Sequence, residues 1–258
     1  MKQKVSCFFI FLPFFLLFIS SNLCGQKAEY REGYHPDGTV RYKGYFIGKE
    51  PQGEVTHYYP EGTIKAVMNH NGSETTARLY SKDGKFFTSG KYIDRKKTGE
   101  WEYRTGDRLL MKDTYQEDKL NGSSYRYDKS SAVAELRTWK SGMLSGPWVL
   151  YYDNGNTRFE TSYVNGKLEG KIRSNTYEGK LSVEGQYRNN LKDGVWRYYN
   201  ADGSLQKEIK YVDGKPENDE AEEMKENQEV DRIVSEGRKI PDPANFVNEP
   251  DVYMRYAE

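Results

Sequence analysis

The sequence predicts an all-β protein, an elongated antiparallel meander of about eight β-hairpin repeats of 22–24 residues, followed by a short C-terminal helix and an extended tail. Two observations carry this prediction. The mean hydropathy is −0.94 and only 36% of the 258 residues are hydrophobic, yet there are 22 Tyr and 24 Gly, which is typical of short strands joined by tight turns. Glycine and aromatic positions also recur in phase along the chain.

The repeat is clearest where two stretches are aligned. Residues 146–155 read Gly-Pro-Trp-Val-Leu-Tyr-Tyr-Asp-Asn-Gly, and residues 194–203 read Gly-Val-Trp-Arg-Tyr-Tyr-Asn-Ala-Asp-Gly. A degenerate first unit begins near Glu29, and the last unit ends near Lys215. The other units begin at Gly53, Ala77, Gly99, Gly122, Gly146, Gly170 and Gly194.

Each unit is predicted to be a hairpin. Asn154-Gly155 and Asp202-Gly203 separate the two strands of a unit, and Asn165-Gly166 separates consecutive units. Glycine is favoured in such turns because they need positive φ. Because both kinds of turn are short, successive strands must run antiparallel, which predicts a meander rather than a parallel solenoid.

Side chains alternate between the two faces of a strand, so residues at equivalent positions should form columns along the sheet. Cross-strand aromatic pairs contribute roughly 0.2–1 kcal/mol each, so such columns can hold a sheet that has little aliphatic core. One column holds Val55, Leu79, Trp101, Trp148, Ile172 and Trp196, and the other holds Phe46, Tyr92, Tyr115, Trp139, Tyr163, Tyr187 and Tyr211.

The main interpretation of these columns is structural. The alternative is that one row is exposed and binds a ligand. The candidate binding face is then Trp101, Trp148, Trp196, Tyr163, Tyr187 and Tyr211.

Residues 1–25 are expected to be a signal peptide. Lys2 and Lys4 give a basic start, residues 5–19 are apolar, and Gly25 is a small residue at the expected cleavage point. Fifteen apolar residues are short for a membrane-spanning helix, which needs about 20. The mature chain is therefore expected to be exported and to be periplasmic, outer-membrane-associated or extracellular.

Both cysteines, Cys7 and Cys24, lie in this segment, so a mature chain beginning at Gln26 has neither a thiol nor a disulfide. Membrane association is expected only if Cys24 is lipidated or the signal is uncleaved. Residues 21–24, Ser-Asn-Leu-Cys, fit the lipoprotein pattern poorly.

The segment 216–258 differs from the repeat domain, residues 26–215. It has 13 acidic and 5 basic residues, whereas the repeat domain has 26 acidic and 32 basic residues. Residues 219–236 lack Gly and Pro and should be helical, with Gly237 as a stop. The expected apolar stripe is Ala221, Met224, Val230, Ile233 and Val234.

Three interpretations of this segment stay open. It is a solvated helix with a disordered end, a cap that folds back over the last hairpin and covers a sheet edge, or a docking peptide for a partner. The cap or docking contact would come from Phe246, Val247, Val252, Tyr253, Met254 and Tyr256.

Catalytic patterns are absent from the sequence, so we expect no enzyme, cofactor or metal. No mature cysteine can act as a nucleophile, and no zinc-protease, serine-hydrolase or phosphate-loop motif occurs. His35, His57 and His70 lie on adjacent hairpins, which is a weak hint of a metal site. Residues 95–97, Arg-Lys-Lys, are predicted to be an exposed turn with at most a weak attraction to anionic lipid or polysaccharide. Nucleic acid is not expected as a partner.

The unit Gly-x-Trp-x-x-Tyr-Tyr-x-x-Gly-x-Leu, seen at residues 194–205, resembles the bacterial variant of the MORN repeat. So does Tyr-x-x-Gly-Lys-x-x-Gly at residues 163–170. The resemblance covers about 190 residues, although the third, fifth and seventh units depart from the pattern.

The resemblance implies a β-hairpin sheet used for binding or scaffolding, in a family of which some bacterial members are labelled antitoxin-like. We therefore expect a non-enzymatic module that binds or scaffolds protein in the bacterial cell envelope. The alternatives are a carbohydrate-binding module that uses an exposed aromatic row and an antitoxin or immunity-like protein.

Overall fold

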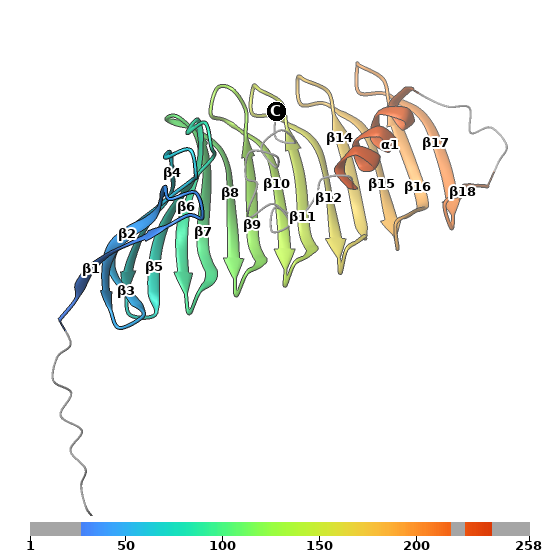
Figure 1. The fold of residues 1–258 in the computed structure, drawn as a ribbon. Coiled ribbons are helices and arrows are strands. Elements are labelled where there is room, and N and C mark those ends of the chain that lie inside the picture. Colours follow the sequence, from blue (N-terminus) through green and yellow to red (C-terminus); the bar gives the residue numbers. More distant parts are fainter. Residues whose placement is uncertain (1–26, 218–224, 239–258) are drawn as a thin grey trace, which may run out of the picture.

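In the computed structural model, which describes residues 27–217 and 225–238, the chain forms one long antiparallel sheet with a single helix across it (Figure 1). The expected signal peptide, its expected cleavage point and the apolar cluster of residues 246–256 lie outside the described residues. The elements are β1 (Glu29–Tyr34), β2 (Val40–Ile47), β3 (Glu50–Tyr58), β4 (Ile64–Asn71), β5 (Glu74–Tyr80), β6 (Phe86–Ile93), β7 (Lys96–Thr105), β8 (Arg108–Gln116), β9 (Lys119–Tyr127), β10 (Val133–Lys140), β11 (Met143–Tyr151), β12 (Thr157–Val164), β13 (Lys167–Leu168), β14 (Gly170–Asn175), β15 (Leu181–Arg188), β16 (Leu191–Tyr199), β17 (Leu205–Val212), β18 (Lys215–Pro216) and α1 (Lys225–Arg238).

The strands follow one another as a meander, as the sequence predicts. From β1 to β12, and again from β14 to β18, each strand pairs antiparallel with the next one along the chain. β13 and β14 both pair with β12, so they share one strand position. The sheet therefore grows in one direction only, with β1 at one edge and β18 at the other.

The turns take the backbone conformation that the glycines predict, even where glycine is missing. In the fifth unit Ser131 stands at the turn position with φ 71°, and its N–H donates to the carbonyl oxygen of Asp128. The Asp128 carboxylate also accepts hydrogen bonds from the backbone N–H groups of Ser130 and Ala132. These side-chain bonds hold a turn that lacks the usual residue.

The two predicted columns interleave on one face of the sheet. Trp196 packs against Tyr187 and Tyr211 with ring centroids 5.3 and 5.9 Å apart, and Trp101 packs against Tyr92 at 4.9 Å. Such edge-to-face contacts are favourable beyond the area they bury. Trp101 and Trp196 are fully buried, which confirms the structural interpretation of the ladders.

Each of these indoles lies against a strand that has no side chain beneath the ring. A Cβ added to Gly185 would lie 2.4 Å from the Trp196 ring, and a Cβ added to Gly90 would lie 2.3 Å from the Trp101 ring. Glycine at these positions is therefore required by close packing.

Helix α1 lies across the C-terminal strands on this same face (Figure 1). Val230, Ile233 and Val234 are buried in one cluster with Trp148 and Trp196. Burial of Val230, Ile233 and Val234 confirms this part of the predicted apolar stripe. The other two predicted members, Ala221 and Met224, are not among the residues with described side chains. The helix folds back over a sheet face, not over the edge of the last hairpin.

Gly237 does not end the helix as predicted. It lies within α1, which continues to Arg238, and a Cβ at Gly237 would lie 2.3 Å from the Trp148 ring. Glycine stands here because the helix backbone approaches the indole closely, and not because the chain needs a left-handed stop.

We expect Gly185→Ala to destabilise the protein by about 1–3 kcal/mol, because the added methyl overlaps the Trp196 ring and forces the indole away from the β15 backbone on which it rests. Urea denaturation of the mature chain measures this. The control is Lys171→Ala, exposed on the neighbouring strand, which should change the free energy of unfolding by less than about 0.5 kcal/mol. Equal effects of the two substitutions would contradict the account of the indole–glycine contact.

Candidate functional site

The face of the sheet that carries α1 is here named the helix-bearing face, and it has an occupied part and an open part. Over the C-terminal strands α1 covers the rings with an aliphatic stripe. Over the first hairpins lies an open groove of about 730 Å³. The occupied part shows how this face binds a polypeptide.

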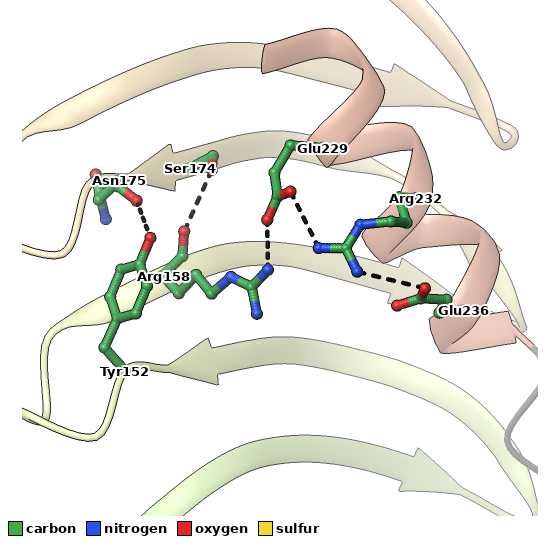
Figure 2. A network of polar contacts seen from close by, with 7 residues as sticks. All are labelled: Tyr152, Arg158, Ser174, Asn175, Glu229, Arg232 and Glu236. Carbon is green, nitrogen blue, oxygen red and sulfur yellow. Dashed lines mark hydrogen bonds and ion pairs between the residues drawn. The ribbon is translucent and has the colours of Figure 1, made fainter. Parts of the chain in front are cut away.

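One flank of α1 is held by ion pairs (Figure 2). Arg158 on β12 donates to Glu229, and Arg232 on the helix donates to the same carboxylate at 3.0 Å and lies 3.5 Å from Glu236. Burial raises the pKa of Glu229, but the hydrogen bonds from Arg158 and Arg232 outweigh it, and the pKa is lowered overall. The ion pairs therefore hold the helix while the Glu229 carboxylate is ionised.

The opposite flank is held by Lys192 at the start of β16. Its ammonium lies 3.0 Å from the carboxylate of Asp231. The same ammonium lies 4.9 Å from the ring centre of Trp196 and 5.5 Å from that of Tyr211. A cation over aromatic faces is attracted by the rings, and the carboxylate of the helix supplies the counter-charge.

The C-terminal end of α1 rests on a buried network. Arg137 on β10 donates at 3.1 Å to the carbonyl oxygen of Gly237 and at 2.6 Å to Glu135, and its guanidinium lies over the Trp148 ring, 5.3 Å from the ring centre. The Trp148 indole N–H donates to the same Glu135 oxygen at 2.7 Å. A cation at the C-terminus of a helix is favourable because the last carbonyl groups carry partial negative charge.

The open groove lies where the Trp column is interrupted. Val55 and Leu79 stand at the positions that hold Trp101, Trp148 and Trp196 in later units. A smaller side chain leaves its space empty, so the face is hollow here. The groove is lined by His35, Arg41, Tyr42, Phe46, Pro51, Val55, His57, Tyr58, Tyr59, Lys65, Ala66, Met68, His70, Leu79, Tyr80 and Tyr92.

The groove is cationic and aromatic. Arg41 and Lys65 are exposed in its lining and lie over the rings of Tyr42 and Tyr59, at 5.5 and 5.6 Å. Among the described residues that line it, none is acidic. Burial lowers the pKa of His57, and the neighbouring His70, Lys65 and Arg41 lower it further, because each disfavours another positive charge. This electrostatic environment favours a ligand that brings negative charge.

The predicted candidate binding face does not coincide with this groove. The structure buries all six of its residues, because the rings pack against one another and against glycine-bearing strands, so the expectation of an exposed Trp and Tyr row there is corrected. These residues are Trp101, Trp148, Trp196, Tyr163, Tyr187 and Tyr211.

Exposed rings lie elsewhere: Tyr177 follows β14, and Tyr30, Tyr34 and Tyr45 lie on the other face of the first hairpin. Tyr30 and Tyr45 are each 52% exposed and pack edge to face at 5.5 Å, and both Tyr30 and Tyr34 donate to Glu32. Sequence reasoning missed this pair because it followed the columns that recur, and these tyrosines belong to the degenerate first unit.

Histidine placement agrees with the adjacency that the sequence suggests. His35, His57 and His70 all line the groove. Within residues 27–217 and 225–238, however, no group of three or more His, Cys, Asp or Glu side chains is arranged to hold a metal ion. In the same ranges no helix is both long and apolar enough to cross a bilayer.

Residues 95–97 are not simply an exposed turn. Arg95 is in the turn and exposed, but Lys97 belongs to β7 and is buried, with its ammonium 4.3 Å from the ring centre of Trp101. The prediction was wrong for Lys97 because it alternates onto the helix-bearing face, where the rings cover it.

Comparison with known families gives a match to the MORN repeat variant over residues 51–71, 144–165 and 192–213. These are the units that begin at Gly53, Gly146 and Gly194. The chain carries MORN repeat variants. MORN repeats are in general non-enzymatic modules, and a repeat sheet of this kind suggests a binding role.

None of the curated proteins compared with this chain matches it. Among solved structures, a TarM mutant of S. aureus, crystallised with fondaparinux, α-GlcNAc-glycerol and UDP, is similar over 63% of this chain at 14% identity and a TM-score of 0.14. The match spans 22% of that protein's length. A likeness at this TM-score carries no argument about function.

We expect acid to release α1 before it unfolds the sheet. Because the pKa of Glu229 is lowered below its ordinary value of 4.5, the stabilisation from its ion pairs is present above that value and is lost as the pH falls through the lowered pKa. Hydrogen exchange, corrected for intrinsic rates, should show α1 losing protection relative to β14–β16 between about pH 5 and pH 3.

The matched variant for this experiment is Glu229→Gln, in which the helix should be looser at neutral pH and should show a smaller acid-dependent step, because only the ion pair between Asp231 and Lys192 is then left on its flanks. Equal pH profiles for α1 in the wild type and in Glu229→Gln would contradict the role of this carboxylate.

Proposed function

We propose that this MORN-repeat protein is a non-enzymatic protein-binding or scaffolding module of the bacterial cell envelope, and that it binds a segment of its partner in the groove over β2–β6. The observation that supports this most directly is the contrast along one face. The same ring columns that hold α1 over the C-terminal strands continue into an open groove over the first hairpins.

The chemistry of the groove defines the partner segment. α1 binds by placing Val230 and Ile233 on the rings while Asp231 and Glu229 meet cations on the sheet. In the groove, Arg41 and Lys65 stand beside aromatic and aliphatic side chains. A segment with one apolar stripe and acidic flanks satisfies both features.

Val55→Trp tests this proposal by restoring the column. Gly44 lies beneath Val55 as Gly185 lies beneath Trp196, because a Cβ on Gly44 would lie 2.7 Å from the Val55 side chain. An indole at position 55 should therefore fit its strand and fill the groove. Acidic amphipathic peptides selected from a displayed library on the mature chain should lose at least about tenfold in affinity on this variant, a loss of about 1.4 kcal/mol.

The control is Thr56→Trp, which adds the same ring to the other face of β3. It should leave peptide affinity within about twofold by calorimetry. Peptides that bind Val55→Trp as well as wild type, or a library from which no sequence is enriched over its scrambled form, would refute the groove as the protein-binding site.

The second candidate is carbohydrate binding. It is favoured by the exposed rings of Tyr30 and Tyr45, which line a pocket with Lys43 and Gln52 on the opposite face, and by the exposed ring of Tyr34 on the same strand as Tyr30. Exposed rings flanked by polar side chains suit stacking against a sugar. Because these rings lie away from the groove, sugar binding on a glycan array would survive Val55→Trp, so the same variant separates the two functions.

We also propose that the protein is exported. The basic start, short apolar run and small residue of residues 1–25 support a cleaved signal peptide. An antitoxin or immunity-like role would then act on a secreted or periplasmic toxin.

The intact mass of protein recovered from the envelope tests this directly. We expect a chain that begins at Gln26 and lacks both cysteines. A mass that includes Cys24 with attached lipid would instead show a membrane-anchored form, and a mass that includes residues 1–25 would contradict cleavage.

A further inference from the structure

The open groove adjoins a second cavity at one end of its strands. This cavity of about 460 Å³, here named the turn pocket, shares Pro51, Met68, His70 and Tyr92 with the groove. The rest of its lining comes from the start of β3, the start of β5 and the turns that follow β4 and β6. A segment that lies in the groove along the strands therefore reaches the turn pocket with one of its ends.

The groove and the turn pocket carry opposite charges at their outer ends. Arg41 and Lys65 are the second residues of β2 and β4, so they lie at the end where these two strands begin. Glu50 begins β3 and Asp94 follows β6, which places both at the other end of the strands. Of the described side chains, those that line the groove include no acid, whereas the turn pocket has two carboxylates and one guanidinium.

The two histidines between these ends are subject to different fields. Burial lowers the pKa of His57, and the positive charges around it lower the pKa further. Burial also lowers the pKa of His70, but the carboxylate of Glu50 acts in the opposite direction. His70 is held at the junction of the two cavities by a contact of 3.0 Å between its Nδ1 atom and the Thr75 hydroxyl. The electrostatic potential therefore becomes more negative from His57 towards Glu50.

Glu50 has a partner that a ligand can replace. Arg95, in the turn after β6, lies 3.4 Å from its carboxylate, across the small residues Gly72 and Ser73 of the turn between β4 and β5. The side chains of Arg95 and Glu50 are 86% and 68% exposed. An ion pair this exposed is weak because water screens it. A cation brought by a bound segment can therefore take the place of the Arg95 guanidinium on Glu50.

The distance between the two charged ends sets the length of the segment. His57 pairs with Ala66, next to Lys65, and Glu50 lies seven residues before His57 on β3. Seven residues of strand span roughly 23 Å at about 3.3 Å per residue. A helix covers this span with about 15 residues. The 14-residue α1, which lies on the same face, is of that length.

We propose that the segment bound in the groove is oriented by charge, with its acidic end beside Arg41 and Lys65 and a basic side chain in the turn pocket, on Glu50 and Asp94. This inference rests on the proposed function, and it adds the polarity of the partner segment and a second contact. A segment that is acidic at both ends binds less tightly.

Extension of one selected peptide tests the polarity. An acidic amphipathic peptide selected on the mature chain is extended with Lys-Lys at its N-terminus or at its C-terminus, and Gln-Gln extensions serve as references. We expect Lys-Lys to raise the affinity at least about fivefold over Gln-Gln at one terminus, where it reaches Glu50 and Asp94. At the other terminus it meets Arg41 and Lys65 and should lower the affinity. Calorimetry measures all four peptides.

The paired substitution Glu50→Gln/Asp94→Asn should abolish this gain and leave the affinity of the Gln-Gln peptides within about twofold. Both changes keep the size of the side chain, and Asn tolerates the positive φ of 50° at position 94. The charge-matched control is Glu54→Gln/Asp107→Asn. Glu54 lies on the other face of β3 and Asp107 in the turn between β7 and β8, so this control should retain the gain.

Equal effects of Lys-Lys at the two termini would overturn the orientation, and so would a gain that survives Glu50→Gln/Asp94→Asn or is lost equally in the control. Each of these results leaves the groove as the protein-binding site, because the Gln-Gln peptides still bind there. A library that yields no binding peptide would instead remove the proposed function and the orientation together.

Discussion

The structure depends on one packing arrangement, in which an indole lies flat on a strand that has no side chain beneath it. Gly185 under Trp196 and Gly90 under Trp101 give the ring direct contact with the strand. Tyrosines from the same and the neighbouring unit then close around it edge to face. A single sheet thereby acquires an interior of rings, which explains how a chain with few aliphatic residues holds eighteen strands.

The same arrangement creates binding capacity, because one layer of rings leaves its outer side available to a second layer. α1 supplies that layer over the C-terminal strands, with aliphatic side chains on the rings and acidic side chains on Arg158 and Lys192. Where Val55 replaces the indole, the layer of rings becomes a groove. In the first hairpins the smaller residue in this column leaves the face open, whereas Ile172 in the same column is buried in the cluster that contains the α1 side chains.

Opposite charges on the sheet and on the C-terminal segment also contribute to this binding. The repeat domain is basic and the segment after it is acidic, and the contacts of α1 show that this asymmetry is used within the molecule. The groove keeps Arg41 and Lys65 in its lining. Attraction to acidic segments is thus a general property of this face, while the shape of each unit determines which segment fits.

Much of this architecture could be predicted from the sequence, because the repeat is local. Turn residues such as Asn154-Gly155 fix hairpins within a few positions, and alternation places Trp148 and Tyr163 on one face. The meander and the ladders followed from these signals alone. Even the turn at Ser131, which lacks glycine, could be placed by the phase of its neighbours.

The site could not be predicted in the same way, because it depends on the height of side chains above the sheet and on a long-range contact. Recurrence drew attention to Trp148 and Trp196, which are buried, whereas the groove lies where the recurrence fails, at Val55. The turn-like pattern of residues 95–97 hid the burial of Lys97. Gly237 resembled a helix stop, since the sequence does not show that Trp148 lies against it.

The most direct test of the central claim is a side-chain map of peptide binding. NMR spectra of the mature chain with labelled methionine and leucine methyl groups should show that an acidic amphipathic peptide shifts Met68 and Leu79 in the groove and leaves Leu168, beneath α1, unchanged. Shifts confined to Leu168 and its neighbours, or to residues of the opposite face, would contradict the account, since the peptide would then bind by displacing α1 or without using the ring columns.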